Sequence, residues 1–128
     1  MRPLIAVVND DTEFIGLMHD LLAEEDYRVS THLVAANAYR ELLAAQPDLI
    51  VLDIRMETPE AGWQLLEMLR LNRVTTDIPV MVCSADAPFL RAKEAHLREQ
   101  GYDILEKPFD IVALLKKVEL ALERRPDA

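Results

Sequence analysis

Five short apolar runs, each followed by a segment with helical spacing, constrain the fold of this chain more than any other feature of its sequence. The apolar runs lie at residues 4–8, 27–34, 48–53, 78–83 and 102–106. The segments whose apolar residues recur every three or four positions lie at 14–22, 35–43, 63–71, 87–100 and 111–122. Strands that alternate with helices in this way form a parallel sheet with helices on both faces. We therefore predict an α/β fold with a doubly wound sheet of five parallel strands.

The polarity of the runs predicts the order of the strands. The first, third and fourth runs are apolar along their length, as strands buried on both faces must be. The second and fifth runs carry charged side chains, such as Arg28 and Asp103, and belong at the edges of the sheet. With right-handed crossovers, the order 2-1-3-4-5 meets these conditions, which is the flavodoxin-like (βα)5 arrangement.

The composition suits a single domain over residues 1–128. About half of the residues (51%) are apolar, which is enough to build a core at this length. The net charge of −9 argues against a nucleic-acid partner and favours a ligand that brings positive charge, such as a metal ion. We find no signal peptide and no stretch long enough to span a bilayer. The single cysteine, Cys83, fits a reducing compartment, so we expect a cytoplasmic protein without a membrane partner.

Polar side chains gather where the predicted strands end. In a sheet of this order, ligands bind beyond the carboxyl ends of the strands, beside the point where the winding reverses. The residues at those ends are Asn9, Asp10 and Asp11 after the first strand, Asp53 after the third, Ser84 after the fourth and Lys107 after the fifth. Carboxylates in one place need a cation among them, and oxygen ligands without His or Cys suit Mg²⁺. A carboxylate, a hydroxyl and an amine around Mg²⁺ favour phosphoryl transfer, in which an aspartate is able to accept the group.

Four motifs make the chain resemble the receiver domain of two-component response regulators over essentially its whole length. They read VVNDD, LIVLDIRM, PVMVCSA and EKPFD, in that order and at nearly the spacing of that family. The resemblance implies that Asp53 accepts a phosphoryl group from a histidine kinase or a phosphotransfer protein. It implies that Asp10 and Asp53 bind Mg²⁺ together with the backbone carbonyl of Arg55. It also implies that Ser84 hydrogen-bonds the phosphoryl group and acts as a switch, and that Lys107 pairs with a phosphoryl oxygen.

One departure from the family pattern concerns the metal. The family usually has two adjacent acids after the first strand, where this chain has Asn9 and Asp10. The first acid normally reaches the metal through water, a place that Asn9 could keep as a neutral partner. We expect weaker Mg²⁺ binding because one negative charge is missing. Asp11 is expected at the start of a helix, facing solvent, more than as a replacement for the missing acid.

Two further departures concern the loop after Asp53 and the switch. The segment METPEAGW is one residue longer than is usual in the family, which displaces Pro59 and Gly62. The family's switch aromatic, three residues before the lysine, is replaced by Ile104, a β-branched side chain that is stiff at χ1. Tyr102 is expected on the same side of the strand and could partly substitute.

We expect no output domain after the last helix, and the signal is therefore expected to leave the domain by protein contacts. The expected output surface consists of the helix 87–100, the strand 102–106 and the helix 111–122, which could contact an unknown downstream protein or a second copy in a homodimer. Asn9, Ile104 and the longer loop leave open a second interpretation, a receiver-like binding module that works without phosphorylation. The third interpretation is a phosphatase with an aspartate nucleophile. Such enzymes usually carry a D-x-D pattern after their first strand, where this chain reads N-D-D-T. We therefore do not expect an enzyme beyond phosphoryl acceptance and self-dephosphorylation.

Overall fold

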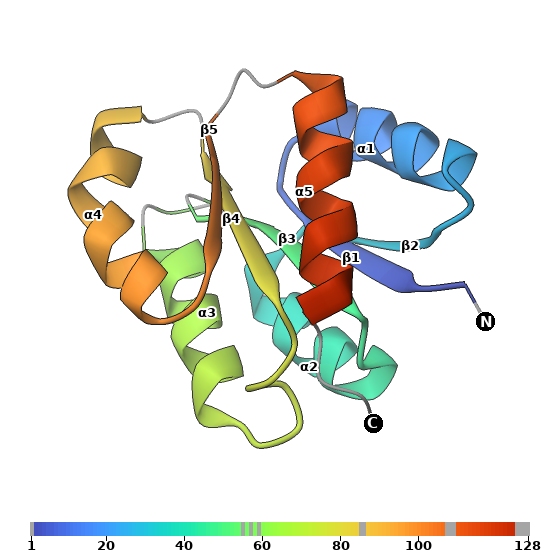
Figure 1. The fold of residues 1–128 in the computed structure, drawn as a ribbon. Coiled ribbons are helices and arrows are strands. Elements are labelled where there is room, and N and C mark those ends of the chain that lie inside the picture. The colour runs from blue at the N-terminus through green and yellow to red at the C-terminus, as the bar shows by residue number, and fades with distance from the viewer. Residues whose placement is uncertain are drawn as a thin grey trace.

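The chain folds into one parallel sheet with helices on both faces (Figure 1). The computed structural model describes residues 2–54, 56, 58, 60–84, 87–106 and 110–124, without the side chains of Ala87 and Arg124. The strands are β1 (Leu4–Val8), β2 (Arg28–His32), β3 (Leu49–Asp53), β4 (Val80–Ser84) and β5 (Asp103–Glu106). The helices are α1 (Thr12–Glu24), α2 (Ala35–Ala45), α3 (Ala61–Leu71), α4 (Ala87–Glu99) and α5 (Ile111–Arg124). The strand order is β2-β1-β3-β4-β5 with every pair parallel, which confirms the predicted topology.

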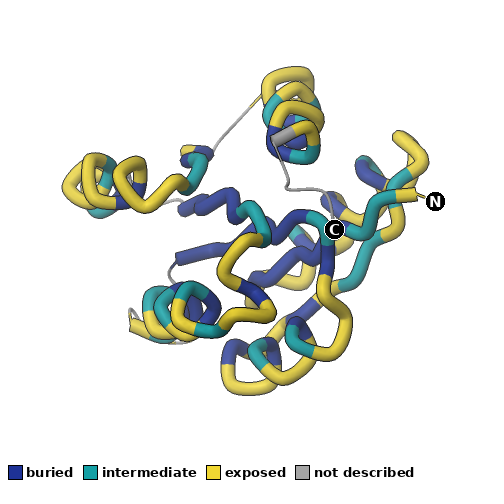
Figure 2. Tube along the Cα trace, turned by 60° about the horizontal axis from the view of Figure 1, so that its bottom comes forward, coloured by how far each residue is buried: buried dark blue, intermediate teal, exposed yellow. Residues whose placement is uncertain are grey.

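The central strands are the most buried part of the molecule, as their sequences require. Every residue of β3 and β4 is buried, whereas Arg28 on the edge strand β2 and Glu106 on the edge strand β5 are exposed. Figure 2 shows this contrast, with buried strands in the middle and helices that expose their outer sides. A parallel strand in this position has both faces covered, so only its carboxyl end is able to offer a polar side chain to solvent.

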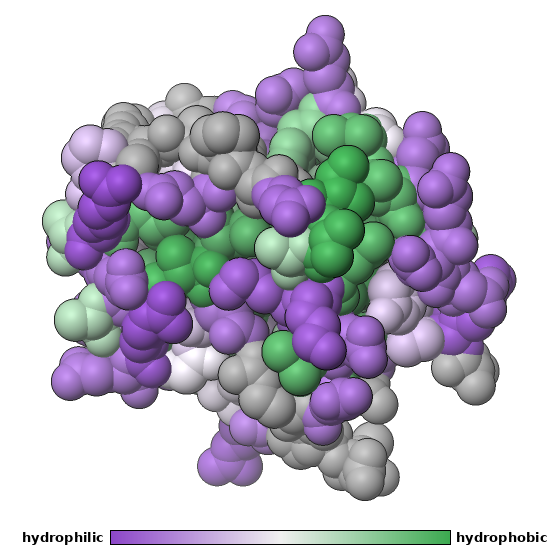
Figure 3. Space-filling view, turned by 45° about the horizontal axis from the view of Figure 1, so that its top comes forward, coloured by the Kyte–Doolittle hydropathy of each residue, from purple (hydrophilic) through white to green (hydrophobic). Residues whose placement is uncertain are grey.

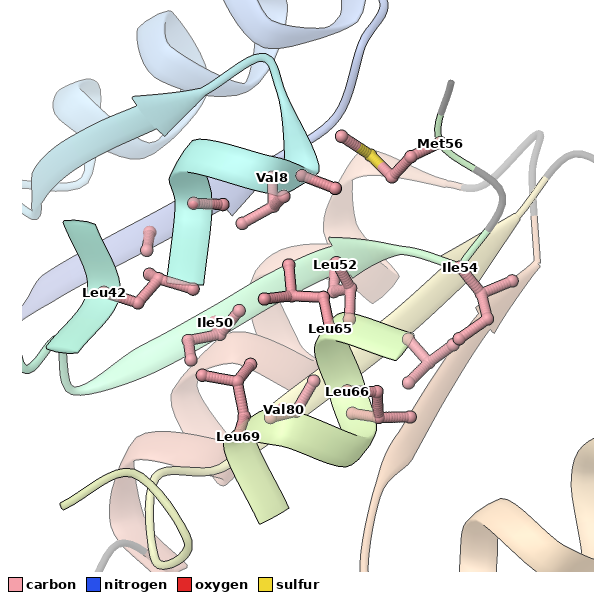
Figure 4. Packing of buried hydrophobic residues seen from close by; sticks show 14 of the residues in the cluster. Val8, Leu42, Ile50, Leu52, Ile54, Met56, Leu65, Leu66, Leu69 and Val80 are labelled. Atoms are coloured by element: carbon pink, nitrogen blue, oxygen red, sulfur yellow. The ribbon is translucent and has the colours of Figure 1, made fainter. Parts of the chain in front are cut away.

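Two apolar clusters fill the space between the sheet and its two helix layers. One joins residues of β1, β3 and β4 to α2, α3 and α4. Figure 4 shows its centre, where Ile50 and Leu52 of β3 face Leu65, Leu66 and Leu69 of α3. The other cluster joins the opposite sides of the same strands to α1 and α5. Because side chains alternate along a strand, odd-numbered residues of β1 and β3 face α1 and α5, and even-numbered residues face the other layer.

The helices begin and end close to the predicted positions. Asp11 is the N-cap of α1, since its side chain accepts hydrogen bonds from the backbone at the start of the helix. Helix α2 ends at Ala45, and its C-cap Gln46 has a left-handed backbone with φ 46°. Helix α4 is followed by Gly101, whose φ of 86° suits a residue without a Cβ. Helix α3 starts at Ala61, two residues earlier than its apolar spacing predicts.

Among the described residues, none of the helices combines the length and the apolar character that a membrane crossing requires.

Candidate functional site

The carboxyl ends of β1, β3 and β4 bring three of the predicted site residues to one edge of the sheet. Asp53 is the last residue of β3, and only 8% of its surface is exposed. Its neighbour on β4 is Cys83, so Ser84, with 1% exposed, lies one position further along. On the other side Val8 pairs with Leu52, so the next step of the same register places Asn9 beside Asp53. The structure thus places Asn9, Asp53 and Ser84 at the same edge of the sheet.

The turn between β1 and α1 is held by two side chains that bond to the backbone. The Asn9 Oδ1 accepts a hydrogen bond from the Asp11 backbone N–H at 2.9 Å. The Asp11 Oδ1 in turn accepts from the backbone N–H groups of Glu13 at 3.0 Å and Phe14 at 3.4 Å. Asp11 is thus a helix cap, as expected, and its carboxylate already has backbone partners. Asp10 lies between the two and is exposed, as Asp11 is.

Asn9 is more deeply buried than its polarity leads one to expect. No part of its surface is exposed, and its Nδ2 has no hydrogen-bond partner among the described residues. Its backbone N–H donates to the His32 carbonyl oxygen at 3.0 Å, which continues the pairing of β1 with β2. A buried amide nitrogen without an acceptor is costly, so this atom requires an explanation.

Gly62 explains how α3 approaches the end of β3 so closely. A Cβ on this residue would lie 2.5 Å from the backbone oxygen of Asp53 and closer still to that of Ile54. Only glycine fits there, and the start of α3 is therefore packed directly against the backbone of the candidate phosphoacceptor. Relative to the family pattern this glycine is displaced along the sequence, yet it makes a close contact with the end of β3.

Two predicted site residues, Arg55 and Lys107, lie outside the described residues, as does Pro59. Within the described part of the chain, no group of three or more His, Cys, Asp or Glu side chains is arranged to hold a metal ion. Mg²⁺ does not need such a group, because it is usually held by one or two carboxylates together with waters and phosphate oxygens. Asp53 and the exposed Asp10, both at the same sheet edge, match that donor set.

The predicted switch residue, Ile104, is part of the hydrophobic core. Ile104 is 8% exposed and belongs to the cluster beneath α3 and α4. Tyr102 packs against the same cluster, as its place two residues away predicts. Burial raises the pKa of the Tyr102 phenol above its ordinary value of 10.0; the charge of Arg70 lowers it and that of Glu67 raises it.

Two interactions near the site were not predicted from the sequence. His32 at the end of β2 is 6% exposed; its Nδ1 lies 2.8 Å from the Glu41 Oε1, and its Nε2 lies 3.0 Å from the Ser30 Oγ. Trp63, next to Gly62, contacts α4: its ring centroid is 5.8 Å from that of His96. The sequence signal for the His32 interactions was the spacing of Ser30 and His32, which lie two residues apart on one strand.

The Trp63 contact also includes a cation. The Lys93 Nζ lies 5.7 Å from the centroid of the Trp63 ring, within the range of a cation–π interaction. Because Gly62 contacts the backbone of Asp53, residues 62 and 63 connect the end of β3 to α4.

The family described as Response regulator receiver domain matches residues 5–119 of the chain. The chain belongs to the response regulator receiver domain family. The receiver domain is therefore part of two-component signalling and is not a conventional enzyme. It is 32% identical over 120 residues to the nitrogen assimilation regulatory protein NtrX of Azorhizobium caulinodans, a match that covers 93% of this chain.

Solved structures show the same fold. The receiver domain of NtrX from Brucella abortus has a TM-score of 0.82 and 26% identity over 94% of this chain and 98% of that one. The receiver domain of the sensor histidine kinase PA1611 from Pseudomonas aeruginosa PAO1, which holds a magnesium ion in its active site cleft, has a TM-score of 0.82 at 21% identity, covering 96% of this chain and 99% of that one. This receiver domain spans 26% of the length of the Azorhizobium protein.

Proposed function

We propose that this receiver domain accepts a phosphoryl group on Asp53, with Mg²⁺, from a histidine kinase or a histidine phosphotransfer protein. The observation that supports this most is the position of Asp53. A strand that is buried at every residue ends in a carboxylate that keeps 8% of its surface exposed, at the edge where Asn9, Asp10 and Ser84 also lie. A purely structural acid gains nothing from such a position, since a buried charge costs free energy unless something pairs with it.

In the proposed reaction a carboxylate oxygen of Asp53 attacks the phosphorus of a phosphohistidine. The new O–P bond makes an acyl phosphate, the P–N bond breaks, and its electron pair stays on the imidazole nitrogen. We assign to Ser84, at the end of the neighbouring strand, a hydrogen bond from its hydroxyl to a phosphoryl oxygen, as the family resemblance implies. We assign to Lys107 the pairing with a second phosphoryl oxygen, as the family resemblance implies.

Mg²⁺ would be held by Asp10, Asp53 and the backbone carbonyl of Arg55, and when bound it supplies positive charge that neutralises the phosphoryl oxygens. The magnesium ion in the cleft of the Pseudomonas aeruginosa receiver domain supports this assignment. Asp10 is suited to a metal ligand because it is exposed at this edge, whereas the side chains of Asn9 and Asp11 accept hydrogen bonds from the backbone of the turn.

The phosphodonor protein would approach across the ends of α1 and α5 that lie beside the site. Both helices begin at the same sheet edge, and large apolar side chains are exposed there: Leu17 (50%), Ile111 (45%) and Val112 (73%). Figure 3 shows green apolar patches among purple hydrophilic side chains on the face that includes these helix ends. Exposed apolar side chains ringed by polar ones are typical of a surface that contacts another protein.

The test is incubation with a small phosphodonor and Mg²⁺, followed by intact mass measurement. We expect the mass of one phosphoryl group to be added to the wild type and not to Asp53→Asn. Removal of Mg²⁺ with a chelator should suppress the gain. A folded wild-type protein that never gains mass under these conditions would contradict the proposal.

The same result would favour the second candidate, a binding module that works without phosphorylation. The specific observation in its favour is Asn9, a buried neutral side chain at a position where the family usually has an acid. Under this alternative, a partner would bind wild type and Asp53→Asn with equal affinity.

The output surface is proposed to be the face formed by α4, β5 and α5. There the Arg91 guanidinium lies 3.3 Å from the Glu106 carboxylate and links α4 to β5. Lys117, Leu120 and Glu123 of α5 line a shallow hollow beside β5. Phosphorylation adds about 1.5 to 2 negative charges at the site, which would change the partner preference of this face for a downstream protein or a second copy. Light scattering of the protein with and without a phosphoryl mimic separates homodimerisation from a role for another partner.

A further inference from the structure

The His32 ring, at the end of the edge strand β2, is held between a carboxylate and a hydroxyl. Its Nδ1 lies 2.8 Å from the Glu41 Oε1, and its Nε2 lies 3.0 Å from the Ser30 Oγ. The ring is only 6% exposed, whereas the Glu41 side chain is 49% exposed and Ser30 is partly exposed. The three side chains therefore form a chain of hydrogen bonds that runs from a carboxylate through a buried imidazole to a hydroxyl.

The two partners determine which nitrogen of the neutral ring carries the proton. A carboxylate only accepts hydrogen bonds, so the Nδ1 that faces Glu41 must be the protonated nitrogen. The Nε2 then has a free lone pair and accepts the hydrogen bond that the Ser30 hydroxyl donates. A hydroxyl bonded to a base, with the base oriented by a third group, is the arrangement that activates a serine as a nucleophile.

The fold accounts for the meeting of these three residues. Ser30 and His32 are two residues apart on β2, so their side chains leave the strand on the same face. In the register of the sheet Ser30 lies beside Ala6, whose side chain faces the layer of α2 and α3. Helix α2 covers this face and carries Glu41, which holds the imidazole from the side opposite to the hydroxyl.

The edge of the sheet beside Ser30 offers a backbone donor. Strand β2 is the first strand of the sheet and pairs with β1 alone (Figure 1). The Arg28 N–H and the His32 carbonyl oxygen both bond toward β1, to Pro3 and Asn9. Because backbone groups alternate in direction along a strand, the N–H of residue 31 points away from β1, toward the open edge. An N–H of the residue after a nucleophile is able to stabilise the negative charge that develops on the attacked group.

Apolar side chains lie next to this group. Leu33 and Val34 directly follow His32, and both are exposed. They offer apolar surface to an acyl chain, while the net charge of −9 and the Glu41 carboxylate disfavour a negatively charged reagent. The chemistry of the surroundings therefore suits a small, neutral ester.

We propose that Ser30 is a reactive serine and a covalent modification site that takes an acyl group from a small, neutral, activated ester. The Ser30 Oγ forms a bond to the acyl carbon while the His32 Nε2 takes the hydroxyl proton. The bond from the acyl carbon to the leaving oxygen breaks, and that oxygen keeps the electron pair and receives the proton from His32. Glu41 is a positioning residue that holds the ring in the required tautomer. The product is an O-acyl serine, and its formation does not depend on the phosphorylation of Asp53.

The first experiment treats the folded protein with a fluorophosphonate, a probe for activated serines. The Ser30 Oγ should form a bond to phosphorus as the P–F bond breaks and fluoride leaves with the electron pair. Intact mass gives the rate, and peptide mapping distinguishes Ser30 from Ser84, the other serine of the chain. His32→Gln should react about a hundredfold more slowly or less, because the general base is lost. Thr31→Ala, the matched control, removes the neighbouring hydroxyl but keeps its backbone N–H and should react like wild type.

No label on Ser30 of the folded wild type would overturn the proposal, as would a wild-type rate in a folded His32→Gln. If His32→Gln does not fold, the half-exposed Glu41 provides the decisive variants. Glu41→Gln should react roughly tenfold more slowly per folded molecule, because a hydrogen bond to a charged group is lost. Glu41→Asp keeps a carboxylate and should recover part of the rate. Equal rates for Glu41→Gln and wild type would overturn the role of Glu41.

Nitrogen nuclear magnetic resonance tests the tautomer without any reagent. In the wild type at neutral pH, the His32 ring should carry its proton on Nδ1 and none on Nε2. A ring with a proton on Nε2 would make Ser30 the acceptor and would overturn the proposal.

A last measurement tests the class of reagent and separates this inference from the proposed function. The wild type treated with p-nitrophenyl acetate should gain the mass of one acetyl group on Ser30, and Ser30→Ala should not gain it at that position. If the wild type gains phosphoryl mass from a phosphodonor but no label on Ser30, this inference is wrong and the proposed function stands. If Ser30 is labelled but no phosphoryl mass is gained, the inference stands and the proposed function fails.

Discussion

Two glycine-to-alanine substitutions in the same molecule should have opposite effects on stability. In Gly62→Ala the added Cβ would lie 2.5 Å from the Asp53 backbone oxygen, where ordinary contact begins at 3.4 Å, so α3 must move away from β3 by about 0.9 Å or more. Overpacking of this kind costs about 1–3 kcal/mol, and two backbone oxygens yield less readily than side chains, so we expect a loss of about 2 kcal/mol. In Gly16→Ala, on the exposed face of α1, the Cβ meets nothing within 4 Å. Alanine there should stabilise the helix by about 0.8–1.0 kcal/mol.

Urea unfolding of the two variants measures this difference directly. With a slope of about 1.5 kcal/mol per molar urea, their midpoints should differ by about 2 M, with wild type between them. Gly62→Ala should also slow the phosphorylation of Asp53, because the oxygen that must move belongs to that residue. A Gly62→Ala variant as stable as wild type would refute the close approach of α3, while a destabilised Gly16→Ala would refute the exposed position of that glycine.

Three further predictions concern contacts around the site. Glu41→Gln should lower the free energy of unfolding by about 1 kcal/mol at neutral pH, measured in urea, because it weakens the 2.8 Å bond to the buried His32; an unchanged midpoint would contradict this. Trp63 is the only tryptophan, so its fluorescence emission should change when phosphodonor and Mg²⁺ are added to wild type and stay constant in Asp53→Asn. An unchanged emission in wild type would contradict a coupling of α3 and α4 to the site. The folded protein holds the pKa of Tyr102 above 10.0, so the stability that its neutral phenol contributes is fully present below about pH 10 and is lost as the pH rises through the raised pKa. Tyr102→Phe should therefore reduce the alkaline loss of stability, and an identical pH profile for both proteins would count against the buried phenol.

The sequence was sufficient to predict the sheet and much of the edge that carries the site. The apolar character of the runs fixed which strands lie inside, and the resulting order brought Asn9, Asp53 and Ser84 together although they are far apart along the chain. Parallel strands allow this because all their carboxyl ends meet at one edge. Arg55 and Lys107, which lie outside the described residues, stay predictions.

The orientation of single polar groups could not be predicted in this way. That the Asn9 oxygen bonds to the Asp11 backbone depends on the local turn, which has no periodic signal in the sequence. The pairing of His32 with Glu41 joins a strand to a helix, and only the packed structure brings the two together. Periodicity predicts which face of an element is buried, but the partner of each buried polar atom is decided by three-dimensional packing.

The contact between residues 54 and 62 means that the segment 55–61 starts and finishes at nearly the same place. A closed loop of this kind gains residues at little entropic expense, about 0.1 kcal/mol for growth from six residues to seven. The extra residue expected from the resemblance to the receiver family is therefore compatible with the close junction between β3 and α3. Lengthening the loop beside Asp53 in engineered variants is thus expected to cost little, whereas replacing the glycine that closes it is not.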